Sequence, residues 1–291
     1  MIPTINPVAR VRARMGAALF ARVGGPDGPA IRARIHDTPG PRWFAPGSAI
    51  RIVHGDSSMY VGGVRALLLQ MLHPLAMAGV AGHSGYRGDP WGRLTRTATF
   101  LASTTFGTVD DAEETVARIR AVHDRVRGKA ADGTPYRAGD PHLLRWVHVA
   151  EADSFLTAHD RYGLRPLSPA ARDQYVAQSA TVGRRLGATD LPETVAELRD
   201  AIEGYRPELV ATPEALDAAD FLLREPPVGP AMRFPYLMLA SGAVAMLPGW
   251  ARAELGRDTW PTRTFGPAGA GLVTRAIRWG TRANRPTQNV D

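Results

Sequence analysis

The sequence contains no cysteine among its 291 residues, which excludes disulfides, iron–sulfur clusters and thiolate zinc sites. Any bound metal must rely on histidine, on carboxylates or on the donor atoms of a cofactor. Lysine is almost as scarce, since Lys129 is the single lysine among 35 basic residues. A Schiff-base mechanism therefore has one candidate residue, whereas arginine side chains that suit carboxylates and phosphates are abundant.

Long apolar segments are also missing. The longest apolar run, residues 234–247, is shorter than the roughly 20 residues that cross a bilayer, so we interpret it as a buried core helix. The apolar stretch Met15–Phe20 is too short for a secretory signal, and we expect a cytoplasmic protein without a stable membrane span. A net charge of +7 is compatible with peripheral membrane contact. No nucleic-acid partner is expected, because the arginines are spread along the chain and are not clustered with aromatics.

The sequence predicts an all-α fold. Proline and capping residues mark several helix starts, and no segment shows the alternation of apolar and polar residues that is typical of a strand. Residues 24–48 are rich in glycine and proline and predict an irregular segment. The predicted helices cover residues 64–80, 91–103, 112–127, 141–162, 169–186, 192–205, 213–223 and 231–247. Four of them begin at a proline that follows a capping residue, namely Asp140, Ser168, Thr212 and, with one residue between, Asp190.

The predicted helix 112–127 carries a histidine on its apolar face. His123 follows Val116 and Ile119 at offsets of three and four, with Thr108 as the capping residue and Gly128 at the end. A buried imidazole needs a partner, and two partners fit this pattern. It can bond to a backbone carbonyl in the core, which the spacing alone favours, or it can bind a metal.

The predicted helix 141–162 repeats this arrangement with His148 and Glu151 one turn apart on its apolar face. The two side chains can form a polar pair within the core, which is the interpretation that we favour from the spacing. They can also form a metal ligand with its orienting carboxylate, or two ligands of a non-haem iron. In the last case His73 and His123 would complete the ligand set.

A third group of candidate residues lies in the segment 73–97. Arg93 and Thr97 are four residues apart and share one helical face, and Arg96 lies beside them. On a surface such side chains are simply solvated. Facing a cavity, they would bind carboxylates or stabilise an oxygen anion.

The ordered fragments HPLAMAGVAGHS, DPWGRLTRT, HDRVRG, YRAGDPHLLRWVH and LPGWAR resemble the catalytic domain of the rubber oxygenase (latex clearing protein) and MpaB-type oxygenase family. The resemblance covers roughly residues 45–255. It implies a helical catalytic domain over that range, with a cofactor pocket between core helices. Residues 1–44 are then an N-terminal segment, partly irregular and partly helical, and residues 256–291 are a C-terminal extension.

The resemblance also implies a b-type haem. The family binds the haem iron through the histidine of an H-x-x-V-x-G motif, which is matched here by His123, Val126 and Gly128. It therefore implies that His123 is the proximal iron ligand. The R-x-x-x-T motif, matched by Arg93 and Thr97, lines the family's haem pocket. We expect His148 to be a further cofactor-binding residue.

Two departures from the family pattern change the expected chemistry. Arg96 stands where rubber oxygenases can place a lysine on the iron, and arginine offers no lone pair, so the sixth iron position is open or is taken by His83. Residues 57–88 contain no acidic residue, whereas rubber oxygenases use a distal glutamate in this region. Polyisoprene is therefore not the expected substrate.

The resulting prediction is a haem-b-dependent oxygenase that uses O2 as co-substrate. Its partner is a small, apolar, electron-rich molecule such as an alkene or an aromatic ring, and its expected catalytic residues are Arg93, Arg96 and Thr97. Two alternatives stay open. One is a non-haem iron oxidoreductase that uses His73, His123, His148 and Glu151, and the other is a non-catalytic protein that binds haem or an apolar ligand.

Overall fold

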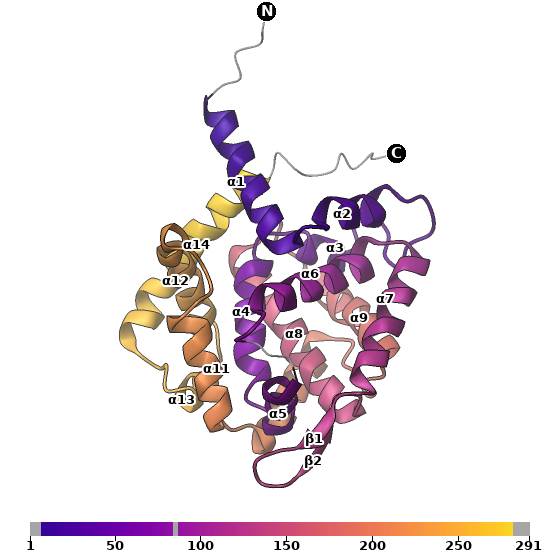
Figure 1. Cartoon of the computed structure of the whole chain (residues 1–291), viewed down its shortest axis with the longest axis vertical. Helices are drawn as coiled ribbons and strands as arrows, with labels where there is room; N and C mark the ends of the chain where they lie inside the picture. Colours follow the sequence, from indigo (N-terminus) through magenta and orange to yellow (C-terminus); the bar gives the residue numbers. More distant parts are fainter. Residues whose placement is uncertain (1–6, 84–86, 282–291) are drawn as a thin grey trace, which may run out of the picture.

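Helices make up almost all of the regular structure in the computed structural model, which describes residues 7–83 and 87–281 (Figure 1). The outer parts of the expected N- and C-terminal segments lie outside the described residues, as do residues 84–86. The helices are α1 Pro7–Gly24, α2 Gly28–Asp37, α3 Ala49–His54, α4 Met59–Gln70, α5 Pro74–His83, α6 Pro90–Phe106, α7 Val109–His123, α8 Pro141–Tyr162, α9 Pro169–Leu186, α10 Val195–Tyr205, the 3-10 helix η1 Arg206–Glu208, α11 Pro213–Arg224, α12 Pro230–Ala245, α13 Gly249–Glu254 and α14 Trp260–Thr281. The predicted all-α fold is confirmed.

Three of the four predicted helix starts are confirmed by their caps. The side chains of Asp140, Ser168 and Thr212 accept hydrogen bonds from backbone N–H groups in the first turns of α8, α9 and α11. The fourth prediction is wrong. Helix α10 begins at Val195 behind a capping box in which Thr194 and Glu197 bond reciprocally, and Asp190 instead adopts a positive φ of 53°.

Residues 24–48 are not irregular throughout, because α2 occupies Gly28–Asp37. Two predicted helices differ most from the observed bounds. The segment 64–80 is not one helix, because α4 and α5 meet at a bend of 106° beside Pro74, whose ring disfavours helical backbone at the preceding residue. Helix α7 ends at His123, four residues before the predicted end. The chain then forms an antiparallel hairpin, in which β1 (Arg127–Lys129) pairs with β2 (Pro135–Arg137).

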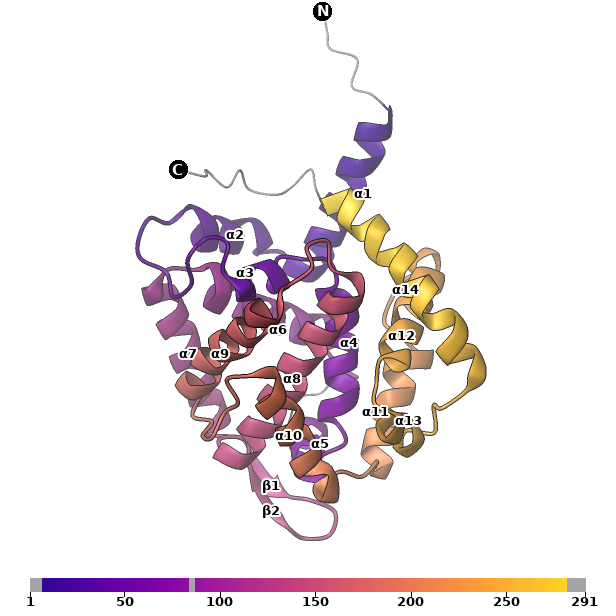
Figure 2. The same ribbon diagram turned by 180° about the vertical axis from the view of Figure 1, so that it is seen from behind.

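The hydrophobic core lies around α4 and α8, which pack against each other along much of their length. Helices α11 to α14 cover one side of this pair, while α6, α7 and α9 cover the other, as both views show (Figures 1 and 2). Helix α14 packs along α12 and also contacts α1. Among the largest fully buried side chains are Trp146, Tyr175 and Tyr205. The hairpin projects at the end of the molecule next to α5 (Figure 1).

The apolar run 234–247 forms most of α12 and is buried only in its second half. Leu239, Ala243 and Val244 belong to the core, whereas the side chain of Phe234 is 71% exposed. The prediction of a buried core helix is therefore correct only for the C-terminal half. In the described part of the chain, no individual helix has the length and apolar character of a membrane span, although the bent pair α4 and α5 meets those criteria together.

Candidate functional site

The arginine-bearing helix α6 begins behind Asp89, whose carboxylate accepts a hydrogen bond of 2.9 Å from Gly92 N. Arg93 lies in the first turns and is half-buried, and burial together with the nearby Arg96 lowers its pKa. Arg96 and Thr97 are exposed, and Arg96 forms an ion pair of 3.2 Å with Asp89. Of the three predicted side chains on this helix, Arg93 is thus the one that the fold withdraws from solvent.

Helix α7 presents His123 at its last position. Thr108 caps the other end by accepting a hydrogen bond of 3.2 Å from Asp111 N, as expected. The ring of His123 is half-buried, and its Nδ1 atom is buried without a hydrogen-bond partner in the described structure. Burial lowers the pKa of His123, while the neighbouring Asp124 acts against this. The imidazole is therefore neutral at neutral pH and keeps an available lone pair.

The glycine that follows His123 in the H-x-x-V-x-G motif has a packing role. Gly128 pairs with Tyr136 across the hairpin, and a Cβ atom at Gly128 would lie 2.7 Å from the Tyr136 hydroxyl oxygen. The same hydroxyl lies 3.3 Å from Nδ1 of His83, which is exposed at the end of α5. The hairpin that follows α7 thus packs against α5. No hydrogen bond or ion pair joins His123 to another predicted site residue in the described structure.

His148 and Glu151 on α8 do not form the predicted pair, because no hydrogen bond or ion pair joins them. Nε2 of His148 is buried and has no partner among the described residues. Burial, and then Arg184, lowers the pKa of His148 to about 4. Burial raises the pKa of Glu151 to about 7, although both side chains remain only half-buried by surface area. The one-turn spacing of the two residues on α8 predicted a polar pair, but it could not indicate that their side chains would remain apart.

Unpaired polar atoms are also buried on the neighbouring helices. They include His54 Nε2 on α3, Ser103 Oγ on α6 and Thr115 Oγ1 on α7, each without a hydrogen-bond partner in the described structure. Helix α3 packs against α6 and α8, and α6 packs against α7. Buried polar groups are normally satisfied by protein, water or ligand, so these atoms are available to a ligand or to water.

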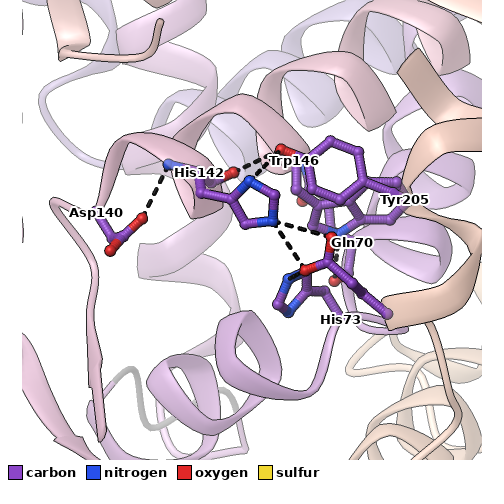
Figure 3. Close-up of polar contacts among 7 residues, drawn as sticks. Gln70, His73, Asp140, His142, Trp146 and Tyr205 are labelled. Atoms are coloured by element: carbon purple, nitrogen blue, oxygen red, sulfur yellow. Dashed lines mark hydrogen bonds and ion pairs between the residues drawn. The ribbon is translucent and has the colours of Figure 1, made fainter. Parts of the chain in front are cut away.

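The non-haem ligand set predicted from the sequence is wrong. His73 lies at the α4–α5 bend, and its neighbours there are His142 and Glu208 (Figure 3). Within the described residues, this is the one group of three or more potential ligands whose atoms all lie within 4.8 Å of one another. No local pattern predicts this group, because the three residues are far apart in the chain and only the packing of α8 and η1 onto the bend brings them together.

In a comparison with known protein families, one family model matches most of the chain. Residues 51–280 match the model of the catalytic domain described as ER-bound oxygenase MpaB/B′ and rubber oxygenase. The curated proteins and the solved structures gave no match.

Proposed function

The chain belongs to the family of MpaB-type and rubber oxygenase catalytic domains, and from this premise we propose that it is a haem-b-dependent oxygenase. The proposed co-substrate is O2, and the proposed substrate is a small, apolar, electron-rich molecule such as an alkene or an aromatic ring. Oxygenase membership follows from the match over residues 51–280. The haem, the substrate class and the roles of individual residues are the proposed part.

The main support for the proposal is that His123 is a neutral, half-buried imidazole with an unpaired Nδ1. An iron ligand must be a neutral imidazole, and burial lowers the pKa of His123 so that this form prevails. Its buried Nδ1 has no hydrogen-bond partner in the described structure, which supports a role other than that of an ordinary hydrogen-bonded core histidine. The residue also opens the H-x-x-V-x-G motif, whose glycine is required by the packing of Tyr136. His123 therefore fits the role of proximal ligand.

The surroundings fit a haem in charge and polarity. A haem combines a flat apolar ring with two propionate carboxylates, and the half-buried guanidinium of Arg93 is suited to hold a carboxylate. The unpaired atoms of His54, Ser103 and His148 provide further polar contacts within the same group of helices. Arg96 contributes less, because its exposed guanidinium already pairs with Asp89.

When bound, haem would supply the centre at which O2 is bound and activated. The chain's own residues then have separable tasks. Arg93 would hold a propionate or donate hydrogen bonds within the site, whereas Thr97, which was expected to act with it, faces solvent on the same helix. The carboxyl group of Glu151, with its pKa near 7, can hold or release a proton at neutral pH. His148, with a pKa of about 4, remains a neutral hydrogen-bonding group.

Titration of the purified protein with haemin tests the ligand assignment. We expect a Soret band that His123→Ala loses or shifts strongly. His36→Ala is the matched control, because His36 on α2 is also half-buried and burial also lowers its pKa, but it lies outside the family motif. The control is expected to bind haem like the parent. An unchanged Soret band in His123→Ala would refute the assignment.

Oxygen consumption separates an oxygenase from a passive haem binder. With haem, a reductant and a panel of apolar alkenes and arenes, the parent is expected to consume O2 in proportion to the product formed. Arg93→Ala is expected to retain the Soret band and to lose about 10²–10³-fold in turnover, the range attributed to removing one preorganised donor. Stable haem binding without product on any panel member would favour the non-catalytic alternative.

A further inference from the structure

We propose that His73, His142 and Glu208 form a site for one divalent first-row transition metal ion, with Zn²⁺ as the preferred ion. We call these three residues the His73 cluster. None of them belongs to the set proposed above to hold haem, so the inference goes beyond the proposed oxygenase function. The cluster joins the α4–α5 bend, the first turn of α8 and the 3-10 helix η1.

The distances within the cluster match those of a metal site. Oε2 of Glu208 lies 2.8 Å from Nε2 of His142 and 3.4 Å from Nε2 of His73. All three ligand atoms lie within 4.8 Å of one another. In tetrahedral zinc sites with bonds of about 2.0–2.1 Å, neighbouring ligand atoms are about 3.3 Å apart. Small side-chain movements would therefore complete the coordination.

The buried histidine of the cluster has an incomplete set of polar partners. His73 is 3% exposed, and neither of its ring nitrogens makes a well-aligned hydrogen bond in the described structure, although Nε2 lies 3.4 Å from Oε2 of Glu208. Burying an imidazole in this way is unfavourable. A metal ion between Nε2 and the carboxylate would satisfy both groups.

The carboxylate of the cluster has an unusual environment for this arginine-rich chain. In the described structure, every ion pair outside the cluster uses an arginine, whereas Glu208 faces two imidazoles. Two imidazoles and one carboxylate are a ligand set that a divalent cation binds, and the cation would supply the positive charge that arginine supplies to carboxylates elsewhere in the described structure.

The cluster is held in place by its surroundings (Figure 3). The backbone N–H of His142 donates to Asp140, the N-cap of α8, over 2.9 Å. Tyr205 donates its hydroxyl proton to the backbone oxygen of His142 over 2.8 Å, and its ring packs edge-on against His73. The ring of Trp146 closes another side of His73. Ligands supported in this way need little reorganisation to bind an ion.

One side of the cluster is open. His142 and Glu208 line a surface groove with a volume of about 420 Å³, which also contacts Arg145 and Asp200. An ion bound by two histidines and one carboxylate would keep a coordination position on this side for water or a small ligand, which is the arrangement of catalytic rather than structural zinc sites. The same ligand set with open positions also accepts Fe²⁺, so both ions enter the test.

The test measures metal content and affinity of the full chain, prepared without an affinity tag. After chelator treatment and loading with Zn²⁺, mass spectrometry is expected to find one Zn²⁺ per chain, and calorimetry to give saturable binding. A parallel loading with Fe²⁺ under anaerobic conditions establishes the preference, and Fe²⁺ bound in place of Zn²⁺ would overturn the choice of ion. Absence of saturable binding of either ion would overturn the site.

Variants localise the ion. His142→Ala and Glu208→Gln alter partly exposed side chains, which are 52% and 43% exposed, so they are expected to fold normally while losing at least tenfold in Zn²⁺ affinity. Glu203→Gln, on the exposed surface of α10, is the carboxylate control and is expected to bind like the parent. His123→Ala is expected to retain Zn²⁺ even where it loses haem. Equal Zn²⁺ affinity in His142→Ala, Glu208→Gln and the parent would refute the proposed ligands.

Discussion

Replacing the buried carboxyl of Glu151 by an amide is expected to stabilise the protein increasingly as the pH rises. Burial raises the pKa of Glu151 from 4.5 to about 7. Below pH 4.5 the group is protonated in both the folded and the unfolded chain and has no effect. Between pH 4.5 and 7 the unfolded chain releases the proton while the folded chain retains it, so stability falls as the pH rises, and above pH 7 the loss is complete.

The magnitude follows from the two pKa values. Each pKa unit corresponds to about 1.4 kcal/mol, which gives about 3 kcal/mol for full burial. Because the side chain is half-buried and keeps some water contact, we expect about 2 to 3 kcal/mol. Glutamine has nearly the same shape as the neutral acid and does not titrate.

Urea unfolding followed by circular dichroism, at pH 5, 6, 7 and 8, measures the effect. The unfolding free energy of Glu151→Gln minus that of the parent is expected to increase by about 2 to 3 kcal/mol from pH 4.5 to above 7. Taking this difference cancels the contributions of other titrating groups, including His148. Gly63→Ala adds no titratable group, so the difference between its unfolding free energy and that of the parent is expected not to vary with pH, which makes it the control. For Glu151→Gln, a difference that does not vary with pH would contradict a raised pKa for Glu151 in the folded protein.

Two further predictions concern the contact between α4 and α8, and thermal or urea unfolding measures both. Arg65 is 3% exposed and binds Asp153, Ser154 Oγ and Met246 O over 2.7, 2.7 and 3.0 Å, so Arg65→Met is expected to cost about 3 kcal/mol by leaving Asp153 unpaired. Arg118→Met, which breaks an exposed pair on α7, is expected to cost less than about 0.5 kcal/mol, and equal losses would contradict this ranking. A Cβ atom at Gly62 would lie 2.8 Å from Phe155 Cδ1, whereas one at Gly63 meets nothing within 4 Å. Gly62→Ala is therefore expected to destabilise by about 1–3 kcal/mol and Gly63→Ala to stabilise by up to about 1 kcal/mol, and the same sign for both would be inconsistent with the packing.

The helical class and several helix boundaries could be predicted because their signals are local. Helices α8 and α9 have the predicted bounds, since a capping side chain followed by proline determines each start. Signals that depend on distant residues were less informative. The early end of α7 depends on the hairpin, in which Gly128 pairs with Tyr136, and three-residue strands are too short for an alternating pattern. Helix α10 begins at Val195 because its capping box forms at Thr194, whereas the nearby Pro192 suggested an earlier start.

The candidate site could be predicted only in part. The family resemblance identified its motif residues. It did not predict which of their side chains are exposed, since Arg96 and Thr97 share the helix of Arg93 and still face solvent. The grouping of histidines was the weakest inference. His73 was placed with His123 and His148, whereas the α4–α5 bend turns it toward His142 and Glu208. A bend of this size redirects every side chain beyond it, and spacing along the chain does not report it.

The pyridine haemochromogen spectrum of protein purified from haem-supplemented cultures tests the central proposal most directly. We expect one haem b per chain in the parent and in His36→Ala, and little or none in His123→Ala. Iron without porphyrin in the parent, or a full complement of haem in His123→Ala, would contradict it.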